Sequence, residues 1–256
     1  MSEKQPTIVG LIPARAGSKR VPDKNICLLA GHPVIAYTIA AALESAVFSD
    51  VIVSTDSEQY AEIARYYGAE VPFLRPSELA GDISPDIEWL EYTLKKLEED
   101  GRKYDCFSIL RPTSPFRLPE TIQRAWQAFL KEEGVDSLRA VEKCQQHPGK
   151  MWVVRRRRMM PLLPLGPSEQ PWHSSQYQSL PEVYVQNASL EIAWTRVVLK
   201  ERTIAGNVLM PFFTEETEGF DVNNPYDWNL AEHWVSNGDV QLPAVSQSPY
   251  LSKKFN

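Results

Sequence analysis

The first 135 residues alternate between strand-like and helix-like segments, and this alternation restricts the possible folds more than any other feature of the chain. Strand-like apolar runs lie at 7–13, 50–55 and 105–110, and a short one at 69–74, where Pro72 suggests an edge strand. Segments with helical spacing of apolar residues lie at 33–46, 58–68, 84–100 and 119–133. Strands and helices that alternate in this way form a mostly parallel sheet with helices on both faces. We therefore predict an α/β fold with a mostly parallel, doubly wound sheet.

Beyond residue 135 the pattern changes to short strand-like pieces interrupted by proline and polar residues. We interpret residues from about 140 to 187 as an inserted β-hairpin region in a single domain that spans 1–238. Residues 239–256 show no periodicity and are expected to form an irregular C-terminal tail. The arginine run at 155–158 is expected to be an exposed turn of the hairpin.

Composition excludes several classes of partner. The 256 residues carry a formal net charge of −6, which argues against nucleic acid because nucleic-acid-binding surfaces are basic. No apolar run approaches the roughly 20 residues that a membrane-spanning helix needs, so no membrane partner is expected. Cys27, Cys106 and Cys144 are too scattered for a disulfide framework or a zinc site, and no signal peptide is evident. We expect a cytoplasmic protein.

The loop "ARAGSKRVPDKN" (14–25) directly follows the first strand-like run. Ligands of doubly wound sheets bind at the carboxyl ends of the strands, so this loop is the first place to look for a site. Gly17 permits a tight turn that aims backbone N–H groups at an anion, and Arg15, Lys19 and Lys24 supply charge for phosphate oxygens. The two common glycine-rich nucleotide-binding motifs are absent. The alternative is a solvated basic loop without a ligand.

Two loops after the next strands carry further polar groups. In "STDSE" (54–58), Thr55 and Glu58 have the spacing of a helix capping box, which we prefer to a functional role for Asp56. In "LRPTSPFR" (110–117), two prolines stiffen a turn that presents hydroxyl and guanidinium groups, and a rigid turn without a ligand is the alternative.

A fourth candidate is "GFDVNNPYDW" (219–228), where Asp221 is expected to leave a strand. Carboxylate and amide oxygens here could coordinate Mg²⁺, which prefers oxygen ligands. The competing interpretation is that Asn223 or Asn224 only caps a helix that begins at Pro225.

Taken together, these segments resemble the acylneuraminate cytidylyltransferases (CMP-sialic acid synthetases) over about residues 7–235. The resemblance rests on "IPARAGSKRVPDKN", "STD", "LRPSELAGD", "RPTSP", "HPGK" and "SLPEVYVQNAS", in that order. It implies a fold of the nucleotide-diphospho-sugar transferase type. It also implies two sets of contacts: Ala14, Arg15, Gly17, Ser18, Lys19, Lys24, Asn25 and Arg75 for the nucleotide, and Arg111, Thr113, Ser114, Lys150, Tyr184 and Asn187 for the sugar.

By this resemblance the enzyme transfers CMP from CTP to the anomeric hydroxyl of an acidic nine-carbon 2-keto sugar and releases pyrophosphate. Arg15, Lys19 and Lys24 are then the catalytic cations, since the reaction shifts negative charge onto the leaving pyrophosphate. The resemblance further implies a Mg²⁺ ion held by Asp221 and Asn223, and a homodimer formed through the inserted region.

Three positions depart from the family pattern. Asn223 stands where members usually carry a second metal-binding aspartate, Arg111 where sialate-using members often carry glutamine, and Ala188 where a glycine is usual. We therefore hypothesise a legionaminic- or pseudaminic-type acceptor in place of ordinary sialic acid. Two alternatives are a 3-deoxy-manno-octulosonate-type cytidylyltransferase and a non-catalytic nucleotide-binding regulatory protein of the same fold.

Overall fold

The computed structural model describes residues 5–250, and the chain divides into two compact units. The larger unit comprises Met1–Ala140 and Asn187–Asn256, and the smaller comprises Val141–Gln186. The main sheet has six strands in the order β10-β6-β9-β5-β1-β4. Their bounds are Leu209–Phe213 (β10), Ser137–Lys143 (β6), Tyr184–Trp194 (β9), Cys106–Ile109 (β5), Ile8–Pro13 (β1) and Asp50–Ser54 (β4).

The sheet is mixed and mostly parallel, which confirms the predicted fold class. Strand β1 pairs in parallel with both β4 and β5, whereas β5 pairs antiparallel with β9. The short strands β2 (Leu28–Leu29) and β3 (His32–Pro33) form a separate antiparallel pair.

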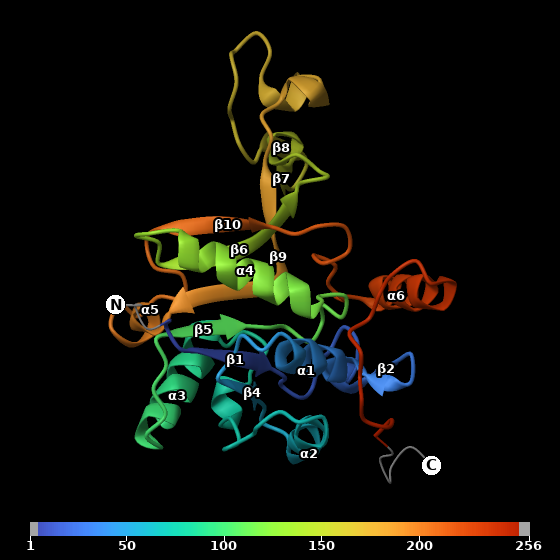
Figure 1. Cartoon of the computed structure of the whole chain (residues 1–256). Helices are drawn as coiled ribbons and strands as arrows, with labels where there is room; N and C mark the ends of the chain where they lie inside the picture. The colour runs from blue at the N-terminus through green and yellow to red at the C-terminus, as the bar shows by residue number, and fades with distance from the viewer. Residues whose placement is uncertain (1–4, 251–256) are drawn as a thin grey trace. The chain divides into compact units, whose positions relative to one another are not determined.

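Helices cover both faces of this sheet, as Figure 1 shows. Helices α1, α2 and α4 contribute to one hydrophobic core, and α3 contributes to a second core together with Val198 of α5. A third cluster lies beneath α6 and includes Leu29 and Phe116. The helices span Val34–Glu44 (α1), Glu58–Tyr66 (α2), Asp86–Glu99 (α3), Pro119–Lys131 (α4), Thr195–Leu199 (α5) and Pro225–Asn237 (α6).

Strand β1 is buried on both faces because its alternate side chains enter different cores. Ile8 and Ile12 belong to the first core, and Val9 and Leu11 to the second. At Gly10 a Cβ atom would lie 3.0 Å from the ring of Phe48, so the strand packs tightly against this ring and a side chain there would require the ring to move. This packing fixes the carboxyl end of β1, from which the basic loop departs.

Three local expectations were wrong. The segment 69–74 forms only a single bridge between Glu70 and Ile52, since Pro72 has no N–H to extend the pairing. Helix α2 is capped by Ser57, whose Oγ accepts a hydrogen bond from the Tyr60 N–H at 3.4 Å, and not by Thr55.

Asp221 lies in an irregular segment rather than at the end of a strand. Among the described residues, a single backbone hydrogen bond ties this segment to the turn after β5: it runs from the Val222 N–H to the Thr113 carbonyl, at 2.8 Å. One such bond positions the segment without forming a strand ladder.

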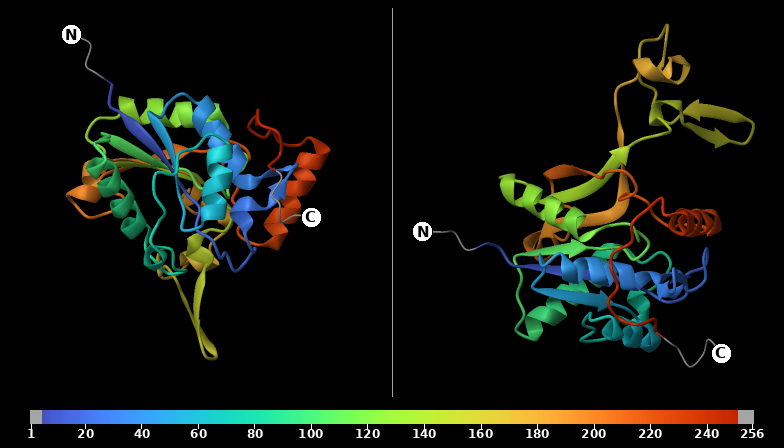
Figure 2. Two further views of the ribbon diagram at one scale, coloured as in Figure 1. Left: turned by 90° about the horizontal axis from the view of Figure 1, so that it is seen from below. Right: turned by 45° about the vertical axis from the view of Figure 1, so that its right-hand side comes forward.

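The smaller unit contains the hairpin of β7 (Trp152–Arg155) and β8 (Arg158–Pro161), followed by short 3₁₀ turns. Arg155 pairs with Arg158, so Arg156 and Arg157 form an exposed turn, as the sequence predicted. The right-hand view of Figure 2 shows the two antiparallel strands. This unit is rich in exposed apolar side chains.

Residues 239–250 have no regular secondary structure, but they contact α2 at its C-terminal end. The Tyr66 hydroxyl donates to the Ser248 carbonyl at 3.0 Å, and the Tyr250 N–H donates to the Tyr67 hydroxyl at 3.0 Å. The rest of the predicted tail, 251–256, lies outside the described residues. Within residues 5–250, no helix is long and apolar enough to cross a membrane.

Asp136, just before β6, holds the loop that leads into β10. Its Oδ2 accepts hydrogen bonds from the backbone N–H groups of Asn207 and Val208 at 2.7 and 2.9 Å, and its Oδ1 accepts one from Arg196 at 2.6 Å. The two backbone donors, and after them Arg196, lower the pKa of Asp136 to about 2.

Replacing Asp136 should therefore weaken the fold in a pH-dependent manner. The folded-state pKa lies below the usual 3.8, so the carboxylate contributes stability above about pH 4 that is lost as the pH falls toward 2. We expect Asp136→Asn to lower the free energy of unfolding by about 1–3 kcal/mol at neutral pH. Urea unfolding followed by circular dichroism should show the difference from wild type shrinking in acid; a difference that is constant with pH would contradict this.

Candidate functional site

A polar pocket of about 360 Å³ lies at the carboxyl end of β1. Nine of the predicted contact residues line it: Arg15, Ser18, Lys24, Asn25, Arg75, Arg111, Thr113, Asp221 and Asn223. A larger cavity of about 650 Å³ is lined mainly by apolar side chains such as Ile26 and Trp228 and contains none of these residues. Because ionisable groups from several loops converge on the smaller pocket, we take it as the candidate active site.

The basic loop is held in place by contacts with its neighbours. Gly17 has φ +72°, a left-handed conformation, and a Cβ atom there would meet nothing within 4 Å. The Ala16 N–H donates to Asp56 Oδ1 at 2.8 Å, and Asn25 Nδ2 donates to the Arg15 carbonyl at 3.2 Å. Asp56 therefore anchors the loop.

Asp82 pairs with two cations of this loop. Arg15 donates to Asp82 Oδ1 at 2.8 Å, and Lys19 binds Asp82 Oδ2. These hydrogen bonds, first from Lys19 and then from Arg15, lower the pKa of Asp82. The carboxylate thus occupies the position on these cations that a phosphate oxygen would need.

Lys24 is partly buried and joins the loop to a distant segment. Its Nζ donates to the Val222 carbonyl at 2.9 Å. Burial lowers the pKa of Lys24, and the nearby Asp221 carboxylate opposes that shift.

The two carboxylate oxygens of Asp221 differ in their hydrogen bonding. Its Oδ2 accepts a hydrogen bond from Asn223 Nδ2 at 2.7 Å, while Oδ1 is buried and has no hydrogen-bond partner among the described residues. A buried carboxylate oxygen without a donor is destabilising unless a cation or a ligand donor meets it.

Asn223 does not cap the following helix. Asn224 caps α6 and forms a capping box with Asp227, and Pro225 is the first helical residue. The Asn223 N–H donates to Asp227 Oδ2 at 2.7 Å, so the cap also fixes the backbone beside Asp221. Across residues 5–250, no three His, Cys, Asp or Glu side chains form a metal-binding cluster. A cation here would take further ligands from substrate or water, as Mg²⁺ commonly does.

Arg75 lies buried at the side of the pocket nearest β4. It donates to Ser54 Oγ at 3.1 Å and to the Ser54 carbonyl at 2.9 Å, and its guanidinium lies 4.8 Å from the ring centroid of Trp89. Burial lowers the pKa of Arg75 to about 10, so the group remains charged at neutral pH.

Arg111 lies between two carboxylates. Its Nη2 is 2.5 Å from Asp86 Oδ2 and 3.3 Å from Glu191 Oε1. Glu191 also pairs with the buried Arg139. Burial opposes ionisation of Asp86, but the charge of Arg111 and hydrogen bonds from Arg111 and Trp89 leave its pKa lowered. Asp82 lies in the segment "LRPSELAGD", but the sequence does not identify Asp82, Asp86 or Glu191 as partners of Arg15 and Arg111, because they lie 67, 25 and 80 residues away along the chain.

Arg117 supports the turn after β5 from the protein interior and does not line the pocket. It is fully buried, donates to Thr38 Oγ1 at 3.0 Å and also donates to the carbonyl of Ser189. Burial lowers its pKa to about 9. Ser114 is likewise buried and its Oγ has no hydrogen-bond partner within the described part of the chain.

The remaining predicted contact residues do not line the pocket. Ala14, Gly17, Lys19 and Ser114 belong to its supporting loops. Asn187 donates to Thr214 Oγ1 at 2.8 Å. Lys150 and Tyr184 belong to the smaller unit, where Lys150 Nζ donates to the Ser175 carbonyl at 2.5 Å.

Comparison with known proteins gives a consistent set of matches. Residues 9–150 match the sequence model of the cytidylyltransferase family. The CMP-N,N'-diacetyllegionaminic acid synthase of Legionella pneumophila is 35% identical over 231 residues, which are 88% of this chain and 94% of that protein. The N-acylneuraminate cytidylyltransferase of Escherichia coli is 48% identical over 110 residues, 43% of this chain and 25% of that protein. The pseudaminic acid cytidylyltransferase of Campylobacter jejuni is 35% identical over 123 residues, 48% of this chain and 53% of that protein.

Solved structures show the same fold at low sequence identity. A CMP:2-keto-3-deoxy-manno-octonic acid synthetase complexed with CTP has a TM-score of 0.67 and 16% identity, over 91% of this chain and 99% of that one. A 4-diphosphocytidyl-2C-methyl-D-erythritol synthase from Anaerococcus prevotii has a TM-score of 0.63 and 11% identity, and the match covers 90% of this chain and 96% of that one. At these identities the likeness concerns the fold alone.

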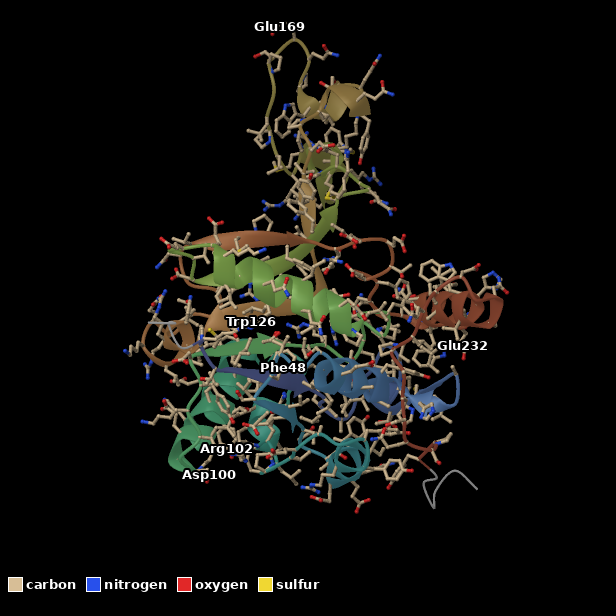
Figure 3. All side chains as sticks on the ribbon, viewed as in Figure 1. Phe48, Asp100, Arg102, Trp126, Glu169 and Glu232 are labelled. Atoms are coloured by element: carbon tan, nitrogen blue, oxygen red, sulfur yellow. The ribbon has the colours of Figure 1, made fainter. Side chains whose placement is uncertain are left out.

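Asp82 should compete with anions for the basic loop. We expect Asp82→Asn to strengthen binding of inorganic tripolyphosphate roughly two- to tenfold, since the anion no longer displaces two exposed ion pairs. Isothermal titration calorimetry at low salt would measure this. Asp100→Asn is the control, because it removes the same charge at the far end of α3, where Figure 3 labels Asp100. Equal affinities in the two variants would contradict the competition.

Proposed function

Because this chain belongs to the cytidylyltransferase family, we propose that it transfers CMP from CTP to the anomeric hydroxyl of a nonulosonic acid and releases pyrophosphate. The enzyme is a nucleotidyltransferase of the acylneuraminate cytidylyltransferase type. One observation carries the proposal: 35% identity over 88% of the chain to a CMP-N,N'-diacetyllegionaminic acid synthase, in a protein whose basic loop opens into a charged pocket.

The charges of the pocket suit a triphosphate. Four cations, Arg15, Lys24, Arg75 and Arg111, line it together with two carboxylates, Asp86 and Asp221. Lys19, next to the pocket, becomes available when Asp82 releases it. Such an excess of positive charge favours an anionic ligand and can stabilise the charge that moves to the leaving pyrophosphate.

In the proposed reaction the anomeric oxygen forms a bond to the α-phosphorus. The bond from that phosphorus to the bridging oxygen breaks, and its electron pair leaves with pyrophosphate. The hydroxyl proton passes to solvent water. Arg15, Lys19 and Lys24 hold the phosphates through the reaction, and their contribution is charge and orientation rather than covalent chemistry.

Asp221 and Asn223 are the residues that would hold Mg²⁺. The buried Asp221 Oδ1, which has no hydrogen-bond partner among the described residues, suits a cation. When bound, the ion would neutralise phosphate charge and acidify the attacking hydroxyl. Asn223 supplies an amide in place of a second carboxylate, so the protein contributes one negative charge to the ion.

We propose a diacylamino acceptor of the legionaminic or pseudaminic type. Arg111 and Ala188 line the pocket at positions where the sequence departs from sialate-using members of the family. One relative that matches along most of its length is named for a legionaminic acid, whereas the match to the E. coli neuraminate enzyme covers 43% of this chain. The octulosonate alternative has only the likeness in fold to support it.

We further propose a cytoplasmic homodimer formed through the smaller unit. Half of the exposed large apolar side chains among the described residues lie between Met151 and Val185. Exposed apolar surface concentrated in this way is typical of protein interfaces. Free cysteines at Cys27, Cys106 and Cys144 suit a reducing compartment.

Removal of the Asp221 carboxylate should abolish turnover while CTP still binds. We expect Asp221→Asn to lower kcat by on the order of 100-fold or more, since the ion loses its charged protein ligand. Asn223→Asp should instead stay active and reach half-maximal rate at a lower Mg²⁺ concentration. A pyrophosphate-release assay with titrated Mg²⁺ measures both; unchanged turnover in Asp221→Asn would remove Asp221 from the metal site.

The function itself is tested by mass spectrometry of the product. Wild-type enzyme, CTP and Mg²⁺ are incubated with sialic, legionaminic, pseudaminic and octulosonic acids in turn. We expect a CMP-sugar with a legionaminic or pseudaminic acid at a higher rate than with N-acetylneuraminate. CTP binding without product from any acceptor would favour the non-catalytic alternative.

A further inference from the structure

Arg117 carries a buried positive charge that has no carboxylate in contact with it. The residue is 1% exposed, and no Asp or Glu oxygen of residues 5–250 lies within 4 Å of its guanidinium nitrogens. Its Nε also lacks a hydrogen-bond partner among these residues. Burial of a charge without a paired counter-charge is strongly destabilising, so other contacts must hold this guanidinium in the protein interior.

Hydrogen bonds to three different parts of the fold fix the guanidinium in one position. Its Nη2 donates to Thr38 Oγ1 of α1 at 3.0 Å, and its Nη1 donates to the Ser189 carbonyl of β9. Both nitrogens also donate to the Arg111 carbonyl, in the turn after β5, at 3.4 Å. Arg117 therefore cannot turn toward a ligand or away from one, in contrast to the exposed cations of the basic loop.

The segment that carries Asp221 packs beside Arg117. Phe116 and Phe220, which precede these two residues in sequence, have ring centroids 5.4 Å apart. The backbone hydrogen bond from Val222 to the turn after β5 holds the same segment in place. The charges sense each other: burial lowers the pKa of Arg117 to about 9, and the Asp221 carboxylate opposes that shift.

Asp221 is thus one carboxylate near two cations. Lys24 is the second cation, because its Nζ donates to the carbonyl of the adjacent Val222 at 2.9 Å. Asn223 adds an amide and no charge. Lys24 lines the pocket and can exchange its carbonyl partner for a phosphate oxygen, whereas Arg117 stays where it is. A divalent cation that approaches Asp221 in the protein alone therefore meets a net positive charge.

We propose that Arg117 makes the binding of a divalent cation at Asp221 conditional on the nucleotide phosphates, an inference that rests on the proposed function. The fixed guanidinium offsets the attraction of the single carboxylate for the ion. The phosphates of a nucleoside triphosphate supply the missing negative charge, so that ion and nucleotide bind cooperatively. Arg117 touches neither of them and acts through Asp221, as a positioning residue.

The inference is tested by the binding of Mn²⁺, which prefers the same oxygen ligands as Mg²⁺ and whose free concentration is measured by electron paramagnetic resonance. Arg117→Met removes the charge, and Arg117→Lys keeps it without the planar fork. Thr38→Val is the structural control, since it removes a hydrogen bond of Arg117 but no charge. Each variant is also combined with Asp221→Asn, and the difference isolates the ion at Asp221 from ions on surface carboxylates.

Without nucleotide, we expect Arg117→Met to bind the Asp221-dependent Mn²⁺ at least about 10-fold more tightly than wild type. Arg117→Lys and Thr38→Val should stay within about threefold of wild type, because both keep the positive charge. If Arg117→Met does not fold, Arg117→Gln replaces it: the amide is neutral but can still donate to one of the carbonyls.

CTP should raise the Mn²⁺ affinity of the wild-type site. At a Mn²⁺ concentration that leaves the Asp221-dependent site of the protein alone mostly empty, saturating CTP should fill it. The comparison with Asp221→Asn at the same CTP concentration subtracts the ions that CTP binds by itself. This second measurement uses no Arg117 variant, so it remains available whatever the stability of those variants.

Three results would contradict the inference. One is Asp221-dependent Mn²⁺ binding that is as tight in wild type as in Arg117→Met. Another is an equal gain in affinity in Arg117→Lys, which would make the effect one of packing and not of charge. The third is no effect of Asp221→Asn in any background, with or without CTP, which would also remove Asp221 from the metal site. Formation of a CMP-sugar is measured separately, so its absence would overturn the proposed reaction without altering these ion affinities.

Discussion

The burial of β1 on both faces is the constraint on which the site depends. Ile8 and Ile12 pack into one core and Val9 and Leu11 into the other, so the strand has no freedom to shift or rotate. Its carboxyl end is therefore a fixed point, and the loops from β4 and β5 meet there because both strands pair with β1 in parallel. The charged side chains of the pocket come from loops, but this strand decides where those loops begin.

Part of the positive charge around the pocket is paired with carboxylates in the protein alone. Asp82 holds two cations of the basic loop, and Asp86 and Glu191 hold Arg111. Ligand binding at the loop is then an exchange of partners rather than the filling of an empty charged site. The ion pairs of Asp82 are exposed and weak, whereas those of Glu191 are buried. We infer that the first set yields to the nucleotide and the second stays fixed.

The sequence predicts those parts of the fold that depend on local pattern. The alternating apolar segments predicted the sheet and its helices, and the segment "ARAGSKRVPDKN" identified the loop whose residues line the pocket. The prediction that Asp221 ends a strand was wrong. An apolar residue such as the adjacent Val222 can be buried by one tertiary contact as well as by a sheet, and the sequence does not distinguish the two. The partners of Arg15 and Arg111 could not be predicted, since Asp82 and Glu191 lie 67 and 80 residues away in sequence.

The hydrogen bond from Lys24 to the Val222 carbonyl has a consequence for biosynthesis. It joins residues 198 positions apart, and Asp221 and Asn223 lie on either side of its acceptor. During translation the core around β1 can begin to form long before residue 222 leaves the ribosome, but the pocket cannot close until then. The growing chain therefore carries an incomplete pocket, whose lining is complete only near the end of synthesis.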